Sequence, residues 1–215
     1  MFDFNTIIVN QNVTTNQFTA TNLNPNANYF WRVLPKNSGC QGEVSGIFRF
    51  TTGSGLVCNP IVNSTNVPVA ISASGTPTVN STLTIPSGQN QTIDKLTVTL
   101  NITHTWVSDL TVTLISPTGT QVQLFSGQCN DADNAVATFD YNGVTLTCQG
   151  STPTITGTLI PAQSLSNFIG QNSQGLWTLR VFDAFNADGG SINSWGITFC
   201  STDTTPLACG AITTT

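Results

Sequence analysis

The stretch Asn101–Thr120, NITHTWVSDLTVTLISPTGT, is the most specific part of this chain. It holds the only histidine of the protein, His104, and an aspartate five residues later, Asp109. Apolar and polar residues then alternate from Leu110 to Leu114, which is the period of a β-strand with one buried face. A Ser-Pro-Thr-Gly turn follows the alternation. Most of the remaining chain is threonine- and asparagine-rich, so this stretch decides how the rest is interpreted.

The composition predicts a folded, extracellular β-protein. Charged residues make up 7% of the 215 residues, far below the ~25% that is usual in globular proteins. The hydrophobic share of 39%, with four tryptophans and twelve phenylalanines, is nevertheless enough to build a core. The surface must then consist of Thr, Ser and Asn. We therefore expect a secreted or cell-surface location.

The charge and hydropathy patterns predict no binding to nucleic acid and no insertion into a membrane. The net charge is −5, and the five basic residues are scattered along the chain at Arg32, Lys36, Arg49, Lys95 and Arg180. A nucleic-acid backbone needs several convergent cations, so we expect no nucleic-acid binding. No segment reaches the ~20 consecutive apolar residues of a membrane helix, so we expect no membrane insertion. The first residues lack the pattern of a signal peptide, and we expect the chain to be a piece of a longer exported protein.

The cysteines predict disulfides. The chain has six of them, far apart and without a C-x-x-C pair. Zinc sites use closely spaced ligand pairs, and the H-E-x-x-H motif of zinc peptidases needs two histidines where this chain has one. Six cysteines allow 15 pairings. Of these we favour Cys129–Cys148, which lie on one long connection, and Cys58–Cys200, which bracket a domain.

Alternating strands separated by Gly, Pro and Asn turns fill the second part of the chain. No stretch shows a sustained helical period. We predict an all-β protein: a jelly-roll-like β-sandwich over residues 60–201, preceded by an incomplete immunoglobulin-like sandwich fragment over residues 1–53. Residues 54–59 would be a linker, and residues 202–215 a linker or tail.

The first part has three strand-like runs, Gln17–Leu23, Tyr29–Leu34 and Ile47–Thr52. Leu23-Asn24-Pro25 followed by Tyr29 predicts a corner in which the tyrosine closes the loop before its strand. With these features the segment resembles the last strands of a fibronectin type III domain, of which about half is present. Half a sandwich leaves an apolar face uncovered, and that face must pack on a neighbour, pair with another chain or stay poorly ordered.

The second part resembles the P domain that follows the catalytic domain in furin- and kexin-type subtilases and occurs in secreted bacterial peptidases. The resemblance covers roughly residues 60–200. It is carried by His104-Thr-Trp-Val-Ser-Asp109-Leu110, the Ser116-Pro-Thr-Gly-Thr120 turn, Gly175-Leu-Trp-Thr-Leu179, and Ser194-Trp-Gly-Ile197.

This resemblance implies a sandwich that stabilises or docks on an adjoining peptidase domain of the same polypeptide without performing the chemistry. The peptidase would be of the serine type by association, and a metallopeptidase parent stays open. The alternative is an adhesion or carbohydrate-binding module of a large surface protein, whose partner would be a glycan or another protein.

His104 and Asp109 raise the question of a Ser-His-Asp triad. The chain has no G-x-S-x-G elbow to present a serine. We therefore interpret His104 as structural, with an imidazole that is hydrogen-bonded to backbone or to a carboxylate and fixes the turn. No catalytic residue is expected in this chain.

The few acidic residues suggest calcium. Ca²⁺ takes six to eight oxygen ligands from carboxylates, amides and carbonyls in flexible loops. The candidate ligands are the aspartates at strand ends and in loops: Asp109, Asp131, Asp133, Asp140 and Asp183. The competing interpretation is a set of Asx turns, in which such side chains bond their own backbone. Residues 183–190, DAFNADGG, look like a hairpin loop with Asp188-Gly189 at positive φ.

Overall fold

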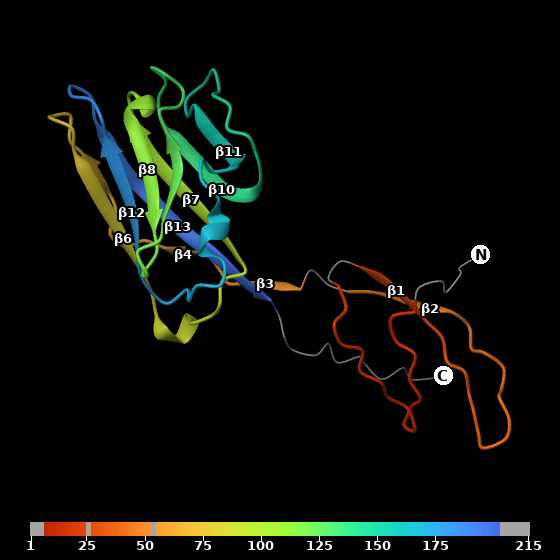
Figure 1. The fold of residues 1–215 in the computed structure, drawn as a ribbon. Coiled ribbons are helices and arrows are strands. Elements are labelled where there is room, and N and C mark those ends of the chain that lie inside the picture. Colours follow the sequence, from red (N-terminus) through yellow and green to blue (C-terminus); the bar gives the residue numbers. More distant parts are fainter. Residues whose placement is uncertain (1–6, 25–26, 53–54, 203–215) are drawn as a thin grey trace. The chain divides into compact units, whose positions relative to one another are not determined.

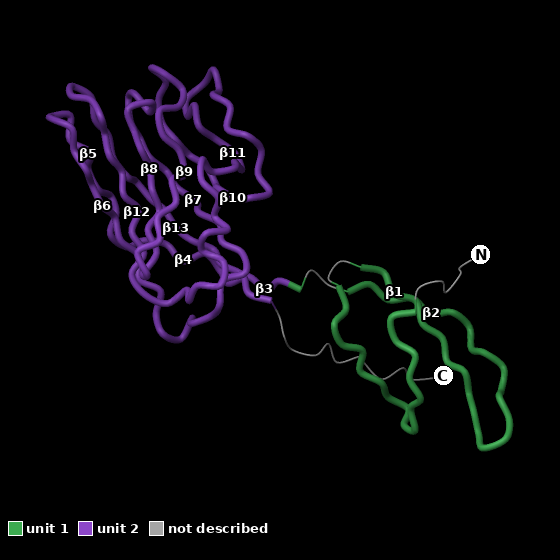
Figure 2. Tube along the Cα trace, in the orientation of Figure 1, with its two compact units in different colours: residues 1–55 green, residues 56–215 purple. Residues whose placement is uncertain are grey.

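The computed structural model describes residues 7–24, 27–52 and 55–202. The chain divides into two compact units, residues 1–55 and residues 56–215 (Figure 2). In the described residues the secondary structure is β-strand with three short 3₁₀ helices and no α-helix. No helix in those residues is long and apolar enough to cross a membrane. The all-β prediction is confirmed.

Eleven strands and three 3₁₀ helices make up the larger unit. The strands are β3 (Leu56–Cys58), β4 (Val62–Asn63), β5 (Val69–Ile71), β6 (Thr78–Ile85), β7 (Lys95–His104), β8 (Leu110–Ile115), β9 (Gln121–Ser126), β10 (Ala135–Val144), β11 (Ile155–Leu159), β12 (Gly175–Asp183) and β13 (Gly190–Thr202). The 3₁₀ helices are η1 (Ser87–Gln89), η2 (Val107–Asp109) and η3 (Leu165–Phe168).

These strands form two sheets that lie as layers of a sandwich (Figure 1). One sheet has the order β6-β12-β8-β9. The other runs β11-β10-β7-β13-β3, and β4 and β5 also pair with β13. All pairs are antiparallel except β10 with β11. The predicted jelly-roll-like sandwich is confirmed.

Strand alternation builds the core between the layers. In β7, the inward residues Leu96, Val98, Leu100 and Ile102 are each at most 2% exposed. Trp177 of β12 is fully buried, and its indole N–H donates to the Ser173 carbonyl at 2.8 Å. Period-two burial is what a sheet with one face against a core requires. The burial patterns of β8, β12 and β13 show the same inward-facing series.

Both favoured disulfides are present. Cys58–Cys200 joins β3 to β13. Cys129–Cys148 joins the loop before β10 to the loop after it. Cys40 is exposed and has no disulfide partner in the described residues, and Cys209 lies outside them. Residues 56–58 were expected in a linker, but they form β3 because they pair with β13 beside the disulfide. The expected linker residues 53–54 and the tail from 203 onward lie outside the described residues.

In the described residues of the smaller unit, β1 (Asn28–Trp31) pairs antiparallel with β2 (Phe48–Thr51). The Tyr29 hydroxyl accepts a hydrogen bond from the Asn24 N–H at 2.7 Å, which confirms the predicted tyrosine corner. The predicted strand at residues 17–23 is wrong. A strand needs a neighbour for its backbone N–H and C=O groups, and no described segment of this unit pairs with residues 17–23.

Candidate functional site

Three aspartates and the single histidine lie at one end of the larger unit, where β7 and β12 both terminate. His104 is the last residue of β7 and Asp183 is the last residue of β12. In each strand this residue continues the inward-facing series, so both side chains point between the sheets. His104 is 2% exposed and Asp183 is fully buried. The sandwich core thus ends in a polar pair contributed by opposite sheets.

The imidazole of His104 is fixed on both sides. Its Nδ1 lies 2.9 Å from the Trp106 carbonyl oxygen and 3.2 Å from the Trp106 nitrogen. Its Nε2 lies 3.3 Å from Oδ2 of Asp183. The backbone N–H of His104 donates to the Asn134 side chain at 2.9 Å. These contacts confirm the interpretation of His104 as an imidazole bonded to backbone and to a carboxylate.

The carboxylate that contacts His104 is distant from it in the chain. Asp109 is near His104 in the chain, but Asp183 makes the contact, from 79 residues away. In the described residues neither ring nitrogen contacts a serine. The geometry therefore supplies no Ser-His-Asp arrangement around His104.

Asp188 enters the same site from the connection between β12 and β13. His104, Asp183 and Asp188 each have a nitrogen or oxygen atom that could bind a metal. These three atoms lie within 4.8 Å of one another. Both carboxylate oxygens of Asp188 are buried, and neither has a hydrogen-bond partner in the described residues. Asp183 differs, since its Oδ1 accepts the Phe185 N–H at 3.1 Å.

The connection at residues 184–189 is not the predicted hairpin loop, because β12 and β13 belong to different sheets. It crosses from one layer to the other, and its positive φ of 94° falls at Ala187 rather than at Asp188-Gly189. The connection ends at Gly190, which is paired with His104. A Cβ at Gly190 would overlap the carbonyl oxygen of Thr103, so only glycine permits this close approach. The approach places Asp188 beside His104.

Asp109 lies at the edge of this group, in η2. Burial raises the pKa of its carboxyl, the nearby carboxylates of Asp188 and Asp183 raise the pKa further, and His104 opposes them. Its backbone carbonyl accepts the Ala184 N–H at 3.0 Å, which holds η2 against the connection from β12. Three carboxylates and one imidazole therefore share a small region, which we call the acidic end: His104, Asp109, Asp183 and Asp188.

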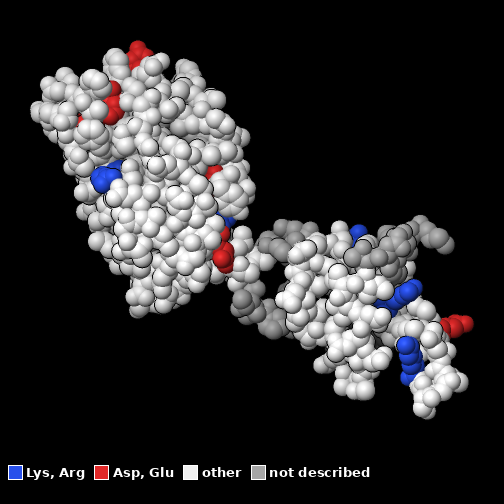
Figure 3. All heavy atoms as spheres, in the orientation of Figure 1, with Lys and Arg blue, Asp and Glu red and all other residues white. Residues whose placement is uncertain are grey.

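In the described residues of the larger unit, both basic side chains, Lys95 and Arg180, bind partners outside the acidic end. The chain has five such residues, and three of them, Arg32, Lys36 and Arg49, precede the larger unit. Lys95 makes an ion pair with Asp140 at 2.8 Å, and the Arg180 guanidinium donates to Gln121 at 2.7 Å. Figure 3 shows one face of the larger unit, on which few charged atoms lie among uncharged ones.

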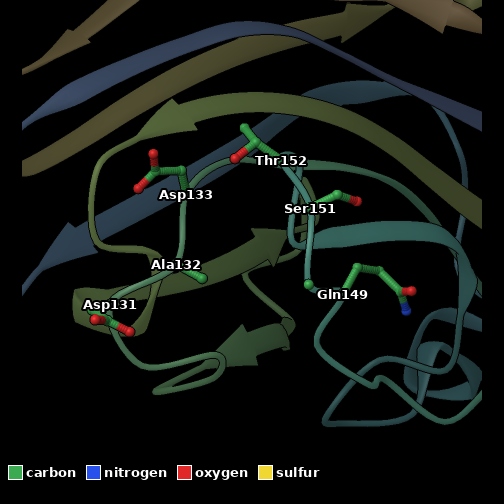
Figure 4. Close-up of a pocket in the computed structure, with 7 residues that line it drawn as sticks. Asp131, Ala132, Asp133, Gln149, Ser151 and Thr152 are labelled. Carbon is green, nitrogen blue, oxygen red and sulfur yellow. The ribbon is translucent and has the colours of Figure 1, made fainter.

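The remaining predicted calcium ligands lie elsewhere. Asp131 and Asp133 line an open polar hollow of about 260 Å³ together with Gln149, Ser151 and Thr152 (Figure 4). Their carboxylates lie apart on the loop rather than converging on one point (Figure 4). Asp140 is engaged by Lys95 and accepts the Asn142 N–H at 3.0 Å.

The structure thus groups two of the five predicted ligands, Asp109 and Asp183, and adds His104 and Asp188 to them. The sequence carried a signal for the first addition. His104 extends the inward series of β7 by one position, and Asp183 does the same in β12. Asp188 had no such signal, because its place depends on the crossing between sheets.

Part of this unit is similar to known proteins. Residues 93–199 match the family model described as "Proprotein convertase P-domain". Among curated proteins, the chain is 31% identical over 134 residues to "Leupeptin-inactivating enzyme 1" of Streptomyces exfoliatus, covering 62% of this chain and 24% of that protein. It is 30% identical over 149 residues to "Transglutaminase-activating metalloprotease" of Streptomyces mobaraensis, covering 69% of this chain and 16% of that protein.

The chain therefore spans about a quarter or less of the length of these relatives. Among solved structures, similarity is found to the serine protease of Aeromonas sobria in complex with its chaperone, at 22% identity and a TM-score of 0.45. That match covers 69% of this chain and 27% of the protease chain. The protease alone gives a TM-score of 0.45 at 20% identity, with 68% and 27% of the two chains covered.

Proposed function

Because residues 93–199 carry a P domain, we propose that this chain is a non-catalytic accessory part of a secreted, multidomain bacterial peptidase. In this role it docks on the catalytic domain of the same polypeptide and stabilises it. The observation that carries the proposal is the P-domain match itself, since the fold alone serves many functions. The names of both curated relatives support an association with proteolysis.

The chemistry of the larger unit is consistent with docking rather than catalysis. The ring nitrogens of its one histidine are taken by Trp106 and Asp183. The outward positions of β6 are Thr78, Asn80, Thr82 and Thr84, which form a neutral polar face. A neutral face can lie against another domain with little cost for removing charge from water.

The segment before the P domain is proposed to be the end of a fibronectin type III-like module. Support comes from the Tyr29 corner and from the ring stacking of Trp31 with Phe48, whose centroids are 4.6 Å apart across β1 and β2. Such a module would act as a spacer within the same polypeptide.

The accessory role can be tested on the longest reading frame that contains this chain. We expect it to encode a peptidase whose melting temperature and specific activity both fall when residues 56–202 are deleted. Deletion of residues 1–52 in the same background is the matched control and should have the smaller effect. A reading frame without a peptidase, or a peptidase indifferent to the deletion, would refute the proposal. Hydrolysis of peptide or ester substrates by this chain alone, lost in His104→Ala, would refute its non-catalytic nature.

A second candidate is binding to a cell-surface glycan, which the exposure of two aromatic rings favours. Trp106 is 46% exposed and Phe185 is 62% exposed. Exposed aromatic rings with polar neighbours suit sugar contacts. A glycan-binding screen of the chain, repeated with Trp106→Ala, separates this function from docking. Binding that depends on Trp106 would support it.

A further inference from the structure

The acidic end holds more negative charge than its surroundings neutralise. Potential ligand atoms of Asp183 and Asp188 lie within 4.8 Å of each other, and the backbone carbonyl of Asp109 accepts the N–H of Ala184, the residue after Asp183, at 3.0 Å. The imidazole of His104 faces the same group, with Nε2 3.3 Å from Oδ2 of Asp183. Like charges at such distances repel strongly in a partly buried site. The arrangement therefore needs a positive partner.

The carboxylate of Asp188 supplies a second and independent sign of a missing partner. Both of its oxygens are buried and unpaired in the described residues. A buried carboxylate without hydrogen bonds costs several kcal/mol. The backbone around it is nevertheless well held, since the Ala187 N–H donates to the Ala73 carbonyl and the Gly75 N–H donates to the Asn186 side chain. The orphaned oxygens thus belong to an ordered connection.

We propose that the acidic end binds a divalent metal cation between the two sheets, held by Asp183 and Asp188 with His104 and Asp109 beside them. The separations fit one ion. Metal–oxygen and metal–nitrogen bonds of about 2.0–2.5 Å place two ligands of one ion at most about 4–5 Å apart. The ligand-capable atoms of His104, Asp183 and Asp188 satisfy this limit, since all lie within 4.8 Å.

The histidine is oriented as a metal ligand would be. Metal-binding imidazoles commonly donate their second ring N–H to a carbonyl or carboxylate. Here Nδ1 lies 2.9 Å from the Trp106 carbonyl and 3.2 Å from the Trp106 nitrogen, and Nε2 faces Asp183. In the tautomer with the proton on Nδ1, directed at the carbonyl, the Nε2 lone pair would be available to a metal. Three carboxylates favour a hard ion such as Ca²⁺ or Mn²⁺. Coordination through Nε2 would favour Mn²⁺ or Zn²⁺ instead.

A bound ion would link the two sheets at one end of the sandwich. Asp183 ends β12 in one sheet, whereas His104 ends β7 in the other, and Asp188 lies on the connection that crosses between them. An ion bound by all three would tie the layers together where the core stops. Metal binding at this site does not depend on a peptidase domain, so its test is independent of the proposed accessory function.

The test uses the full chain, stripped with EDTA and titrated separately with Ca²⁺, Mn²⁺, Zn²⁺ and Mg²⁺. Calorimetry and thermal melting should show one ion per chain and a melting temperature that rises with free metal. Asp188→Asn should weaken binding about tenfold or more. The matched control Asp133→Asn, in the other acidic loop, should bind as the parent chain does. No binding by any of the four ions, or binding lost in Asp133→Asn and kept in Asp188→Asn, would overturn the proposal.

Two further measurements keep the test decisive. In EDTA, Asp188→Asn should melt at or above the parent chain because it removes an unpaired charge, and added metal should reverse that order. A lower melting temperature of this variant in both conditions would overturn the proposal. If the variant does not fold, pulsed electron paramagnetic resonance of the Mn²⁺-loaded parent chain replaces it. Coupling to an imidazole nitrogen would come from His104 alone, since the chain has one histidine. Mn²⁺ without that coupling, and without competition from Ca²⁺, would count against the site.

Discussion

Ser81 is a hydroxyl within the core, fully buried on β6. Its Oγ accepts the indole N–H of Trp195 at 2.8 Å and donates to the Asn66 carbonyl at 2.6 Å. The two bonds explain how a tryptophan that is 1% exposed satisfies its polar atom inside the sandwich. They also link β13 in one sheet to β6 in the other.

Replacing Ser81 by alanine should destabilise the larger unit by about 1–3 kcal/mol, because the buried indole N–H and the Asn66 carbonyl both lose their partner. Urea unfolding followed by tryptophan fluorescence measures the change. Thr84→Ala, an outward position on the same strand, is the control and should stay within about 0.5 kcal/mol of the parent chain. Equal losses in the two variants would contradict the role given to Ser81.

Single residues were predicted well where strand parity decides their environment. Trp177 and Trp195 occupy inward positions of the alternating strands β12 and β13, and both are buried. The alternation of β7 and β12 also implies that His104 and Asp183 point inward. It does not predict that these two side chains contact each other. Their contact joins two different sheets over 79 residues, and sequence alternation does not encode which sheets face each other.

At the scale of elements, β13 carries the most pairings, and its C-terminal end is held by a carboxylate. Oδ2 of Asp94 accepts the backbone N–H of Thr202 at 2.5 Å and its hydroxyl at 2.6 Å. These bonds, the hydroxyl first and the backbone second, lower the pKa of Asp94 from its usual 3.8. The carboxylate form is therefore favoured by folding.

This shift predicts a pH dependence. A carboxyl whose pKa is lower in the folded state adds stability above its unfolded pKa, and that stability is lost as the pH falls through the folded pKa. The melting temperature of the parent chain should therefore exceed that of Asp94→Asn at pH 6, and the gap should narrow below about pH 3.8. Thr202→Val keeps the backbone donor and should show part of the effect. A gap that does not change with pH would contradict the assignment.

The elements that sequence missed share a physical cause. Residues 17–23 have strand composition but lack a paired neighbour in the described residues, and a strand is stable through its partners rather than alone. Residues 183–190 have turn composition, yet they cross between layers instead of closing a hairpin. The local sequence pattern predicts that a segment can form a strand or a turn. The pairing of distant segments decides whether the strand forms and which sheets the turn connects.

For the whole molecule, the larger unit closes on itself. Its first strand, β3, pairs with the last, β13, and the register sets Cys58 opposite Cys200. The disulfide therefore joins the two ends of a unit whose hydrophobic core extends from Ile71 to Phe199. The sequence predicted both disulfide pairs and the sandwich class, but the sheet order followed only from the structure, since alternation is identical for any arrangement of strands.

The two disulfides should differ in their contribution to stability according to the loops they close. Cys58–Cys200 spans 142 residues and Cys129–Cys148 spans 19. In the chain-entropy description, loops of these lengths correspond to about 5 and about 3 kcal/mol of stabilisation. Cys58→Ala with Cys200→Ala should therefore lower the free energy of unfolding more than Cys129→Ala with Cys148→Ala.

Guanidinium unfolding without reductant measures both pairs of variants. The background should carry Cys40→Ser and Cys209→Ser, because a free thiolate would exchange with the remaining disulfide. A larger loss from opening Cys129–Cys148 would mean that closure of the long connection, rather than closure of β3 on β13, is the main constraint on the unfolded chain. The reverse order is expected because the longer loop removes more conformations from the unfolded state.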